Sequence, residues 1–204
     1  MKELNLTSWV KIDNTAIFKD GEELFHFSDE ATAADNLKLA YKELNVDYAK
    51  FFKMDGLSKL GLLASDLLLT DSVKNKYQDD EIAVLLSNRT SSLQSDTDHV
   101  KAYTEKTASP AIFVYTLPNI VVGEICIRHK LLGESNFYIF ENFNAPALLE
   151  QAELLLATTQ TKACLAGWVE YTDQHFEAFL FLLEENGAQK ATPQLLEKIK
   201  DTQY

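Results

Sequence analysis

The feature that most constrains the fold is an apolar segment near the middle of the chain that ends in a basic turn. Residues 120–130 read IVVGEICIRHK. This pattern predicts a helix from Pro118 to Leu131. Thr116 is its expected N-cap, and Gly133 is expected to end it. A helix that is apolar on nearly every face has no side for solvent, so we expect it to lie between layers of the protein or against a second chain.

Strand patterns and helix patterns occur along the whole sequence. Strands are expected over residues 9–12, 16–18, 24–27, 82–86, 137–141, 164–171 and 176–183, and helices over 31–44, 57–68, 93–106, 146–157 and from 193 onward. Because several strands are apolar on both faces, they predict an α/β fold whose mixed, mainly parallel sheet is covered by helices on both faces. A length of 204 residues with 46% hydrophobic content indicates a single domain, residues 1–204.

The charge balance disfavours two classes of partner. The formal net charge is −12, whereas nucleic acids and anionic membrane surfaces attract basic proteins, so we expect neither as a partner. The sequence begins without the apolar core of a signal peptide, and its apolar runs are too short or too interrupted to span a bilayer. We therefore expect no membrane span and a cytoplasmic location.

The order of these segments resembles one enzyme family. Residues 109–133, SPAIFVYTLPNIVVGEICIRHKLLG, are similar to the segment that precedes the nucleophilic cysteine in β-ketoacyl-acyl carrier protein synthases. The strand at 137–141, the helix at 146–157 and the sequence LAGWVE at 165–170 follow in the family's order, the last resembling its Leu-Ala-Gly-Gly-x-Glu pattern. The resemblance covers residues 50–170 and implies the N-terminal half of a thiolase-like fold.

The sequence departs from this family at the nucleophile. Ungapped counting from Gly133 places Asn142 where the family has its cysteine, and a carboxamide cannot attack a thioester. The family's two further catalytic residues, usually histidines, come from the second half of a longer protein. The histidines present stand in none of the expected contexts: His26, His99, His129 and His175. The resemblance therefore implies a subunit without catalytic activity.

No other chemistry is indicated by motifs. Glycine-rich phosphate loops, Cys-x-x-Cys pairs and His-Glu-x-x-His sequences are absent from the sequence, so we expect no cofactor and no metal. Glu124 and Glu170 could form an acid/base pair, but a structural or pocket-lining role suits their expected positions in a helix and a strand better.

The first functional hypothesis is a partner subunit. An apolar, aromatic strand at residues 137–140 would be hazardous as a free sheet edge, and in the thiolase-like fold the corresponding strand pairs across the subunit interface. The resemblance implies a dimer, with itself or with a full-length ketosynthase, like a chain length factor in fatty-acid, polyketide or aryl polyene-type pigment synthesis. The implied acyl-pocket and interface residues are Ile112, Phe113, Val114, Tyr115, Phe137, Tyr138, Ile139 and Phe140.

The second hypothesis is a binding module that holds an acyl chain or an acyl carrier protein without a ketosynthase. Carrier proteins are acidic, so this acidic chain would need a local basic patch to attract one. Four basic residues fall in segments that the family uses for such docking: Lys53, Lys59, Arg128 and Lys130. A solvated basic helix end explains the last two equally well.

Overall fold

The computed structural model describes residues 4–28, 31–187 and 189–202, and all of its strands lie in one sheet. The strand order is β3-β2-β1-β7-β6-β4-β5, with β8 beside β1. The strands are β1 (Asn5–Asp13), β2 (Ala16–Lys19), β3 (Glu22–His26), β4 (Ile82–Asn88), β5 (Ser135–Ile139), β6 (Ala163–Tyr171), β7 (Phe176–Glu184) and β8 (Gln189–Lys190). The helices are α1 (Ala33–Glu43), η1 (Ala49–Lys53), α2 (Gly56–Leu68), α3 (Asp71–Lys74), α4 (Leu93–Thr104), α5 (Pro110–Phe113), η2 (Val114–Thr116), α6 (Ile120–His129), α7 (Ala145–Thr158) and α8 (Pro193–Asp201).

The expected mixed sheet is confirmed, but the expectation that it is mainly parallel is wrong. In the described residues β4 pairs in parallel with β5 and with β6, whereas every other strand pair is antiparallel. The reason lies in the connections. β6 and β7 are joined by residues 172–175 alone, and a parallel neighbour requires a crossover of a dozen residues or more.

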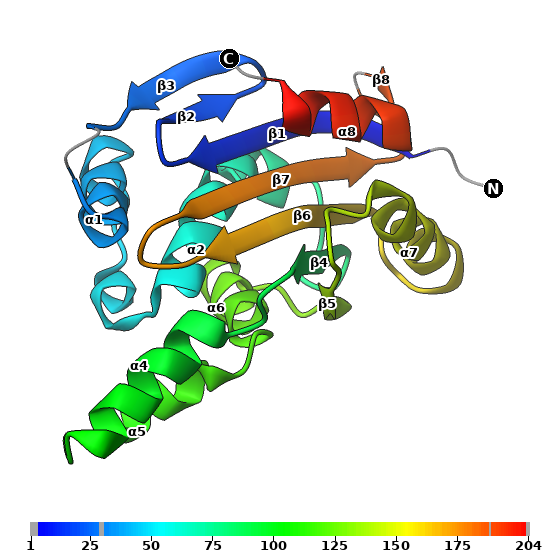
Figure 1. Cartoon of the computed structure of the whole chain (residues 1–204). Coiled ribbons are helices and arrows are strands. Elements are labelled where there is room, and N and C mark those ends of the chain that lie inside the picture. The colour runs from blue at the N-terminus through cyan, green and yellow to red at the C-terminus, as the bar shows by residue number, and fades with distance from the viewer. Residues whose placement is uncertain (1–3, 29–30, 188, 203–204) are drawn as a thin grey trace.

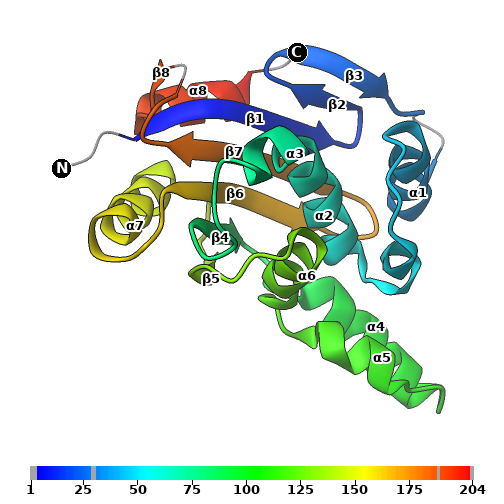
Figure 2. The same cartoon turned by 180° about the vertical axis from the view of Figure 1, so that it is seen from behind.

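Helices cover both faces of the sheet, as expected. On one face α1, α2 and α6 pack over a core that includes Leu180 and Leu182 of β7. On the other face α7 and α8 pack over Phe179 and Phe181 of the same strand. Figures 1 and 2 show the two layers of helices from opposite sides. Alternate residues of a strand point to opposite faces, so the apolar run of β7 supplies both cores at once.

The central helix is shorter than expected and begins differently. α6 spans Ile120–His129, and its N-cap is Asn119 without a side-chain hydrogen bond. Thr116 is not the cap, because it ends η2, and its hydroxyl donates to the carbonyl of Phe113 at 2.8 Å. The helix ends at Lys130, which takes the left-handed conformation with a φ of 58°.

Gly133 does not end the helix, as was expected, but allows a close contact between two backbone segments. A Cβ at this position would lie 2.4 Å from the backbone oxygen of Ile82. The glycine therefore lets the chain pass close to the start of β4 before β5 begins, instead of ending the helix.

One side of α6 is buried and another is open. Val121, Val122 and Ile125 are buried against α2 and the sheet. Ile127, by contrast, is 61% exposed, and nothing lies within 4 Å of the position that a Cβ on Gly123 would occupy. The helix is thus covered on one side only. It therefore carries more apolar side chains than the protein's own core buries.

No single helix in the part of the chain that the structure describes combines the length and the apolar composition that a bilayer crossing needs. The pair 110–116 and 120–129 meets those criteria only when its two parts are joined, and they bend by 102°.

Candidate functional site

The loop that contains Asn142 lies between β5 and α7, in the strand–loop–helix arrangement that the resemblance implied. Asn142 is exposed. Its neighbours hold the loop: the Phe143 ring packs edge-on against Phe179 at 5.5 Å, and the Asn144 side chain accepts a hydrogen bond from the Ala147 amide at 3.1 Å, which caps α7. A nucleophile at Asn142 would therefore stand near a helix N-terminus, but the amide present supplies no nucleophilic atom.

The histidines are distributed over distant elements. His26 lies on β3 near Glu23, His99 contacts Phe113, and His175 belongs to the turn between β6 and β7. His129 is buried beside Asp66 and Ser65. None of these described contacts reaches the loop that holds Asn142.

Glu170 and Glu124 act separately and hold structure in place. The Glu170 carboxylate accepts hydrogen bonds from the Arg89 amide at 2.8 Å and from the Thr90 hydroxyl, so it fixes the turn after β4. Glu124 accepts from the Tyr115 hydroxyl at 3.1 Å, and Lys50 lies 2.6 Å from its other oxygen. The two carboxylates share no partner in the described structure. Both have the structural role that the sequence favoured.

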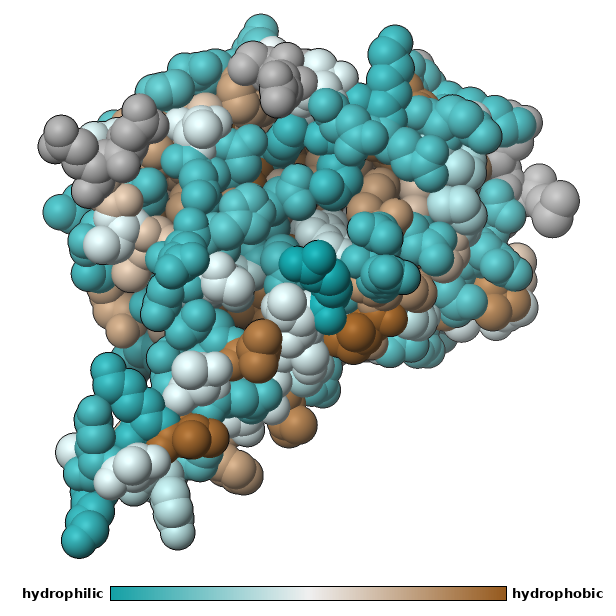
Figure 3. All heavy atoms as spheres, in the orientation of Figure 1, coloured by the Kyte–Doolittle hydropathy of each residue, from teal (hydrophilic) through white to brown (hydrophobic). Residues whose placement is uncertain are grey.

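A helical arm, residues 93–116, projects from the body of the molecule and consists of α4, α5 and η2 (Figures 1 and 2). Figure 3 shows hydrophobic surface on this arm and where it meets the body. Its exposed large apolar side chains are Leu93, Val100, Tyr103, Phe113 and Val114. Soluble proteins seldom expose such a group of side chains without a binding role.

The predicted acyl-pocket residues 112–115 lie on α5 and η2 of this arm, and they differ in exposure. Phe113 and Val114 are exposed, Ile112 is half-buried, and Tyr115 is buried. The Tyr115 hydroxyl anchors the arm to α6 through Glu124. Burial, with a further contribution from that carboxylate, raises the pKa of Tyr115 well above its usual value. Of these four residues, Phe113 and Val114 are therefore the most open to a neighbouring chain.

Strand β5 is the edge of the sheet nearest this arm. β4 is its only strand neighbour in the described structure. The Phe137 ring packs partly into the α6 side of the core. Tyr138 points to the α7 side, where its hydroxyl donates to Gln151 at 3.3 Å and its ring stacks on Phe140 at 5.6 Å. Ile139 is 50% exposed. Of the four aromatic and apolar positions, Ile139 is thus the one most available to a partner.

The four predicted docking bases occupy different surroundings. Lys53 and Lys130 are exposed, and Lys59 is half-buried with its ammonium 5.9 Å from the centre of the Phe51 ring. The Arg128 guanidinium is already engaged: it donates to both oxygens of Asp66, at 3.1 and 2.9 Å, and it stacks over Tyr48. This pairing leaves no pattern in the sequence, because Arg128 and its partners are more than 60 residues apart.

The pairing of Asp66 leads to a testable effect on stability. Burial acts to raise the pKa of Asp66, but hydrogen bonds from His129 and Arg128 outweigh it and hold the pKa below its usual range. The stabilisation from a depressed carboxyl pKa is complete above the unfolded value of about 3.9 and is lost as the pH falls through the folded value. Asp66→Asn should therefore lower the free energy of unfolding by about 2 kcal/mol at pH 7, and this difference should shrink below about pH 4. Urea titrations at several pH values measure it.

Asp71→Asn is the matched control. Asp71 pairs with Lys74 at 3.1 Å on the surface, with its side chain 91% exposed, and such pairs contribute little. A constant difference between Asp66→Asn and the wild type from pH 7 to pH 3 would contradict the assigned role of Asp66.

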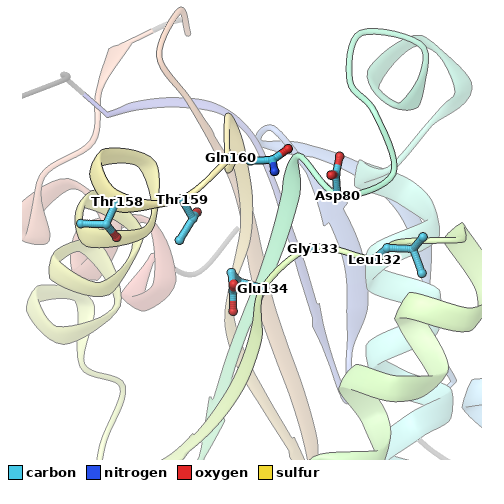
Figure 4. Close-up of a pocket in the computed structure, with 7 residues that line it drawn as sticks. All are labelled: Asp80, Leu132, Gly133, Glu134, Thr158, Thr159 and Gln160. Atoms are coloured by element: carbon cyan, nitrogen blue, oxygen red, sulfur yellow. The ribbon is translucent and has the colours of Figure 1, made fainter.

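Two hollows near the predicted site segments do not favour a small-molecule site. One of about 430 Å³ lies at the amino ends of β4 and β5 and is lined by Asp80, Leu132, Gly133, Glu134, Thr158, Thr159 and Gln160 (Figure 4). Ligand sites of such sheets lie instead at the carboxyl ends of the strands. A second hollow, lined in part by Ile112 and Tyr115, measures about 190 Å³, which is below the roughly 300–1,000 Å³ of typical ligand pockets.

Comparison with known proteins identifies the fold through structure alone. No protein-family model matches the sequence, and no curated protein matches it. The ishigamide ketosynthase/chain length factor matches with a TM-score of 0.63 and 18% identity over 89% of this chain and 62% of its own. A ketosynthase (ApeO) in complex with its chain length factor (ApeC) from Xenorhabdus doucetiae matches with a TM-score of 0.58 and 16% identity, over 97% of this chain and 90% of that chain.

A third solved structure is a type II polyketide synthase acyl-carrier protein in complex with its ketosynthase bound to the hexaketide. It matches with a TM-score of 0.62 and 14% identity, over 98% of this chain and 65% of that chain. This chain has the thiolase-like fold of ketosynthase and chain length factor chains. It spans less than two thirds of two of these three matched chains and most of the remaining one.

Proposed function

We propose that this chain is a noncatalytic, ketosynthase-like subunit that pairs with a complete ketosynthase in the cytoplasm, in fatty-acid, polyketide or aryl polyene-type pigment synthesis. The observation that carries the proposal is the edge strand β5, which has no outer strand neighbour in the described structure and exposes half of Ile139. The exposed apolar side chains of the helical arm add to it. A carboxamide at Asn142, in the loop directly after that strand, leaves the chemistry to the partner.

The fold comparison supports this role in two ways. Chain length factors are named in two of the three matched structures, one of which is a complex with a ketosynthase. In that complex the matched chain is not much longer than this one, since this chain covers 90% of it. A chain of about this length can therefore be a unit of such a complex.

An acyl carrier protein is a further proposed partner, and Lys53, Lys59 and Lys130 are its proposed contacts. Arg128 is less suited to that role, because Asp66 already neutralises it. The alternative of a stand-alone acyl-binding module is favoured by no specific observation, since the hollow near Ile112 and Tyr115 is small.

The test is coexpression with a complete ketosynthase from the same genome, one that retains its cysteine and histidines. Native mass spectrometry should find a 1:1 complex, and condensation by that complex should depend on the partner's cysteine alone. If the ketosynthase forms only its own homodimer while this chain elutes separately at tens of micromolar, the proposed function is wrong.

A further inference from the structure

The free edge of β5 exposes a defined set of backbone groups. The Phe140 amide donates to the Asn88 carbonyl at 2.9 Å, and the Val84 amide donates to the Glu134 carbonyl at 2.9 Å. Even-numbered residues of this segment therefore direct their backbone groups toward β4. Since a strand directs these groups alternately to its two sides, Ser135, Phe137 and Ile139 direct theirs to the free edge.

A second copy of the chain could pair with this edge in only one sense. Closed symmetry of a dimer is twofold, and a continuous sheet across a twofold axis joins two identical edge strands antiparallel. The amino end of one β5 would then lie against the carboxyl end of the other. We call this contact between the two β5 strands the seam. Each end of the seam would combine the charges that flank both ends of β5.

Those flanking charges are mainly acidic. Glu134 and Asp80 line one hollow at the amino end of β5 (Figure 4), and Glu141 follows its carboxyl end, near Arg89. All four residues are exposed, and the described structure has no ion pair from their side chains. Each end of a symmetric seam would therefore hold three carboxylates and one guanidinium.

Other charges near the edge do not compensate for this excess. Glu81 is already paired with Lys162 at 2.5 Å. Lys130 and Asp79 both line a neighbouring hollow, so they add one charge of each sign to that region. The ends of β5 therefore remain net acidic when the adjacent elements are included.

Resting on the proposed function, we propose that the acidic ends of β5 reject a second copy of this chain and select the edge strand of a different chain, one with lysine or arginine at both of its ends. Like charges that meet across a pair of strands destabilise it, and charge at the rim of an interface sets partner choice more than affinity. Glu134 and Glu141 are the specificity-determining residues. The apolar centre of the strand would bind either partner.

The first experiment measures self-association of this chain alone. Sedimentation of the wild type should show a monomer in 50 mM NaCl and more dimer in 500 mM NaCl, because salt screens the repulsion. The double variant Glu134→Gln with Glu141→Gln should dimerise already at 50 mM NaCl, with a dissociation constant at least about tenfold lower than that of the wild type and little dependence on salt.

The matched control is Glu150→Gln with Glu153→Gln, which makes the same change of net charge on the exposed surface of α7. This control should behave as the wild type does. If the Glu134/Glu141 variant also sediments as the wild type at both salt concentrations, or if both double variants dimerise equally, the charge proposal is overturned.

The second experiment separates this inference from the proposed function. Affinity for the coexpressed ketosynthase should fall with rising salt, and Glu134→Lys with Glu141→Lys should weaken it at least about tenfold at 50 mM NaCl. If the affinity of the complex changes neither with salt nor with the double substitution, the charge proposal is overturned and the ketosynthase pairing stands. If no complex forms at all, the pairing is wrong, and the self-association data alone decide the role of the two glutamates.

Discussion

Replacing Gly167 by alanine should destabilise the protein by about 3 kcal/mol or more, because the substitution forces strain into the centre of the sheet. Gly167 has a φ of 154°, which side-chain-bearing residues rarely adopt, and a Cβ there would lie 2.1 Å from the Phe179 oxygen. The strand that holds Gly167, β6, and the strand that holds Phe179, β7, are both buried, so neither can move aside at low cost. Urea unfolding of the two proteins measures the difference.

Gly123→Ala is the matched control for this substitution. Gly123 is an exposed residue of α6, and nothing lies within 4 Å of the position of its added Cβ. Alanine is favoured over glycine in a helix by about 1 kcal/mol, so this variant should be slightly more stable than the wild type. A Gly167→Ala protein that unfolds within 1 kcal/mol of the wild type would show that the β6–β7 pair is more compliant than the geometry implies.

Replacing Ile139 by lysine should weaken assembly with the ketosynthase partner about 100-fold or more. An unpaired charge buried in an interface costs several kcal/mol, and each 1.4 kcal/mol is a factor of ten. The isolated chain should remain folded, since Ile139 is half exposed and lysine is common on edge strands. Titration of labelled chain with the partner, followed by fluorescence anisotropy, measures the affinity.

Leu154→Lys provides a control of equal exposure. Leu154 is also 50% exposed, but it lies on α7 and not on the edge strand, so its substitution should leave the affinity unchanged. Tyr138 is unsuited to this test because its ring and hydroxyl contact Phe140 and Gln151 of the same chain. Equal affinities of the Ile139→Lys and wild-type proteins would exclude β5 from the interface.

The sequence by itself determined most of the strands, the longer helices and the place of Asn142 in the loop after β5. Continuous apolar runs such as residues 176–183 predicted a strand buried on both faces, and β7 supplies both cores because its side chains alternate. Asn142 could be placed after β5 because the order of the segments is local information. Residue type alone then excluded a thiolate at that position.

Only the tertiary structure decided the strand directions, the boundaries of α6 and the pairing of its last turn. The short connection at residues 172–175 made β6 and β7 antiparallel, and η2 displaced the start of the helix from Pro118 to Ile120. Arg128 is engaged by Asp66 across two helices. Contacts between residues far apart in the sequence leave no periodic pattern in it, so the exposure of Ile139 and the grouping of Glu134 with Asp80 became visible only once the chain was folded.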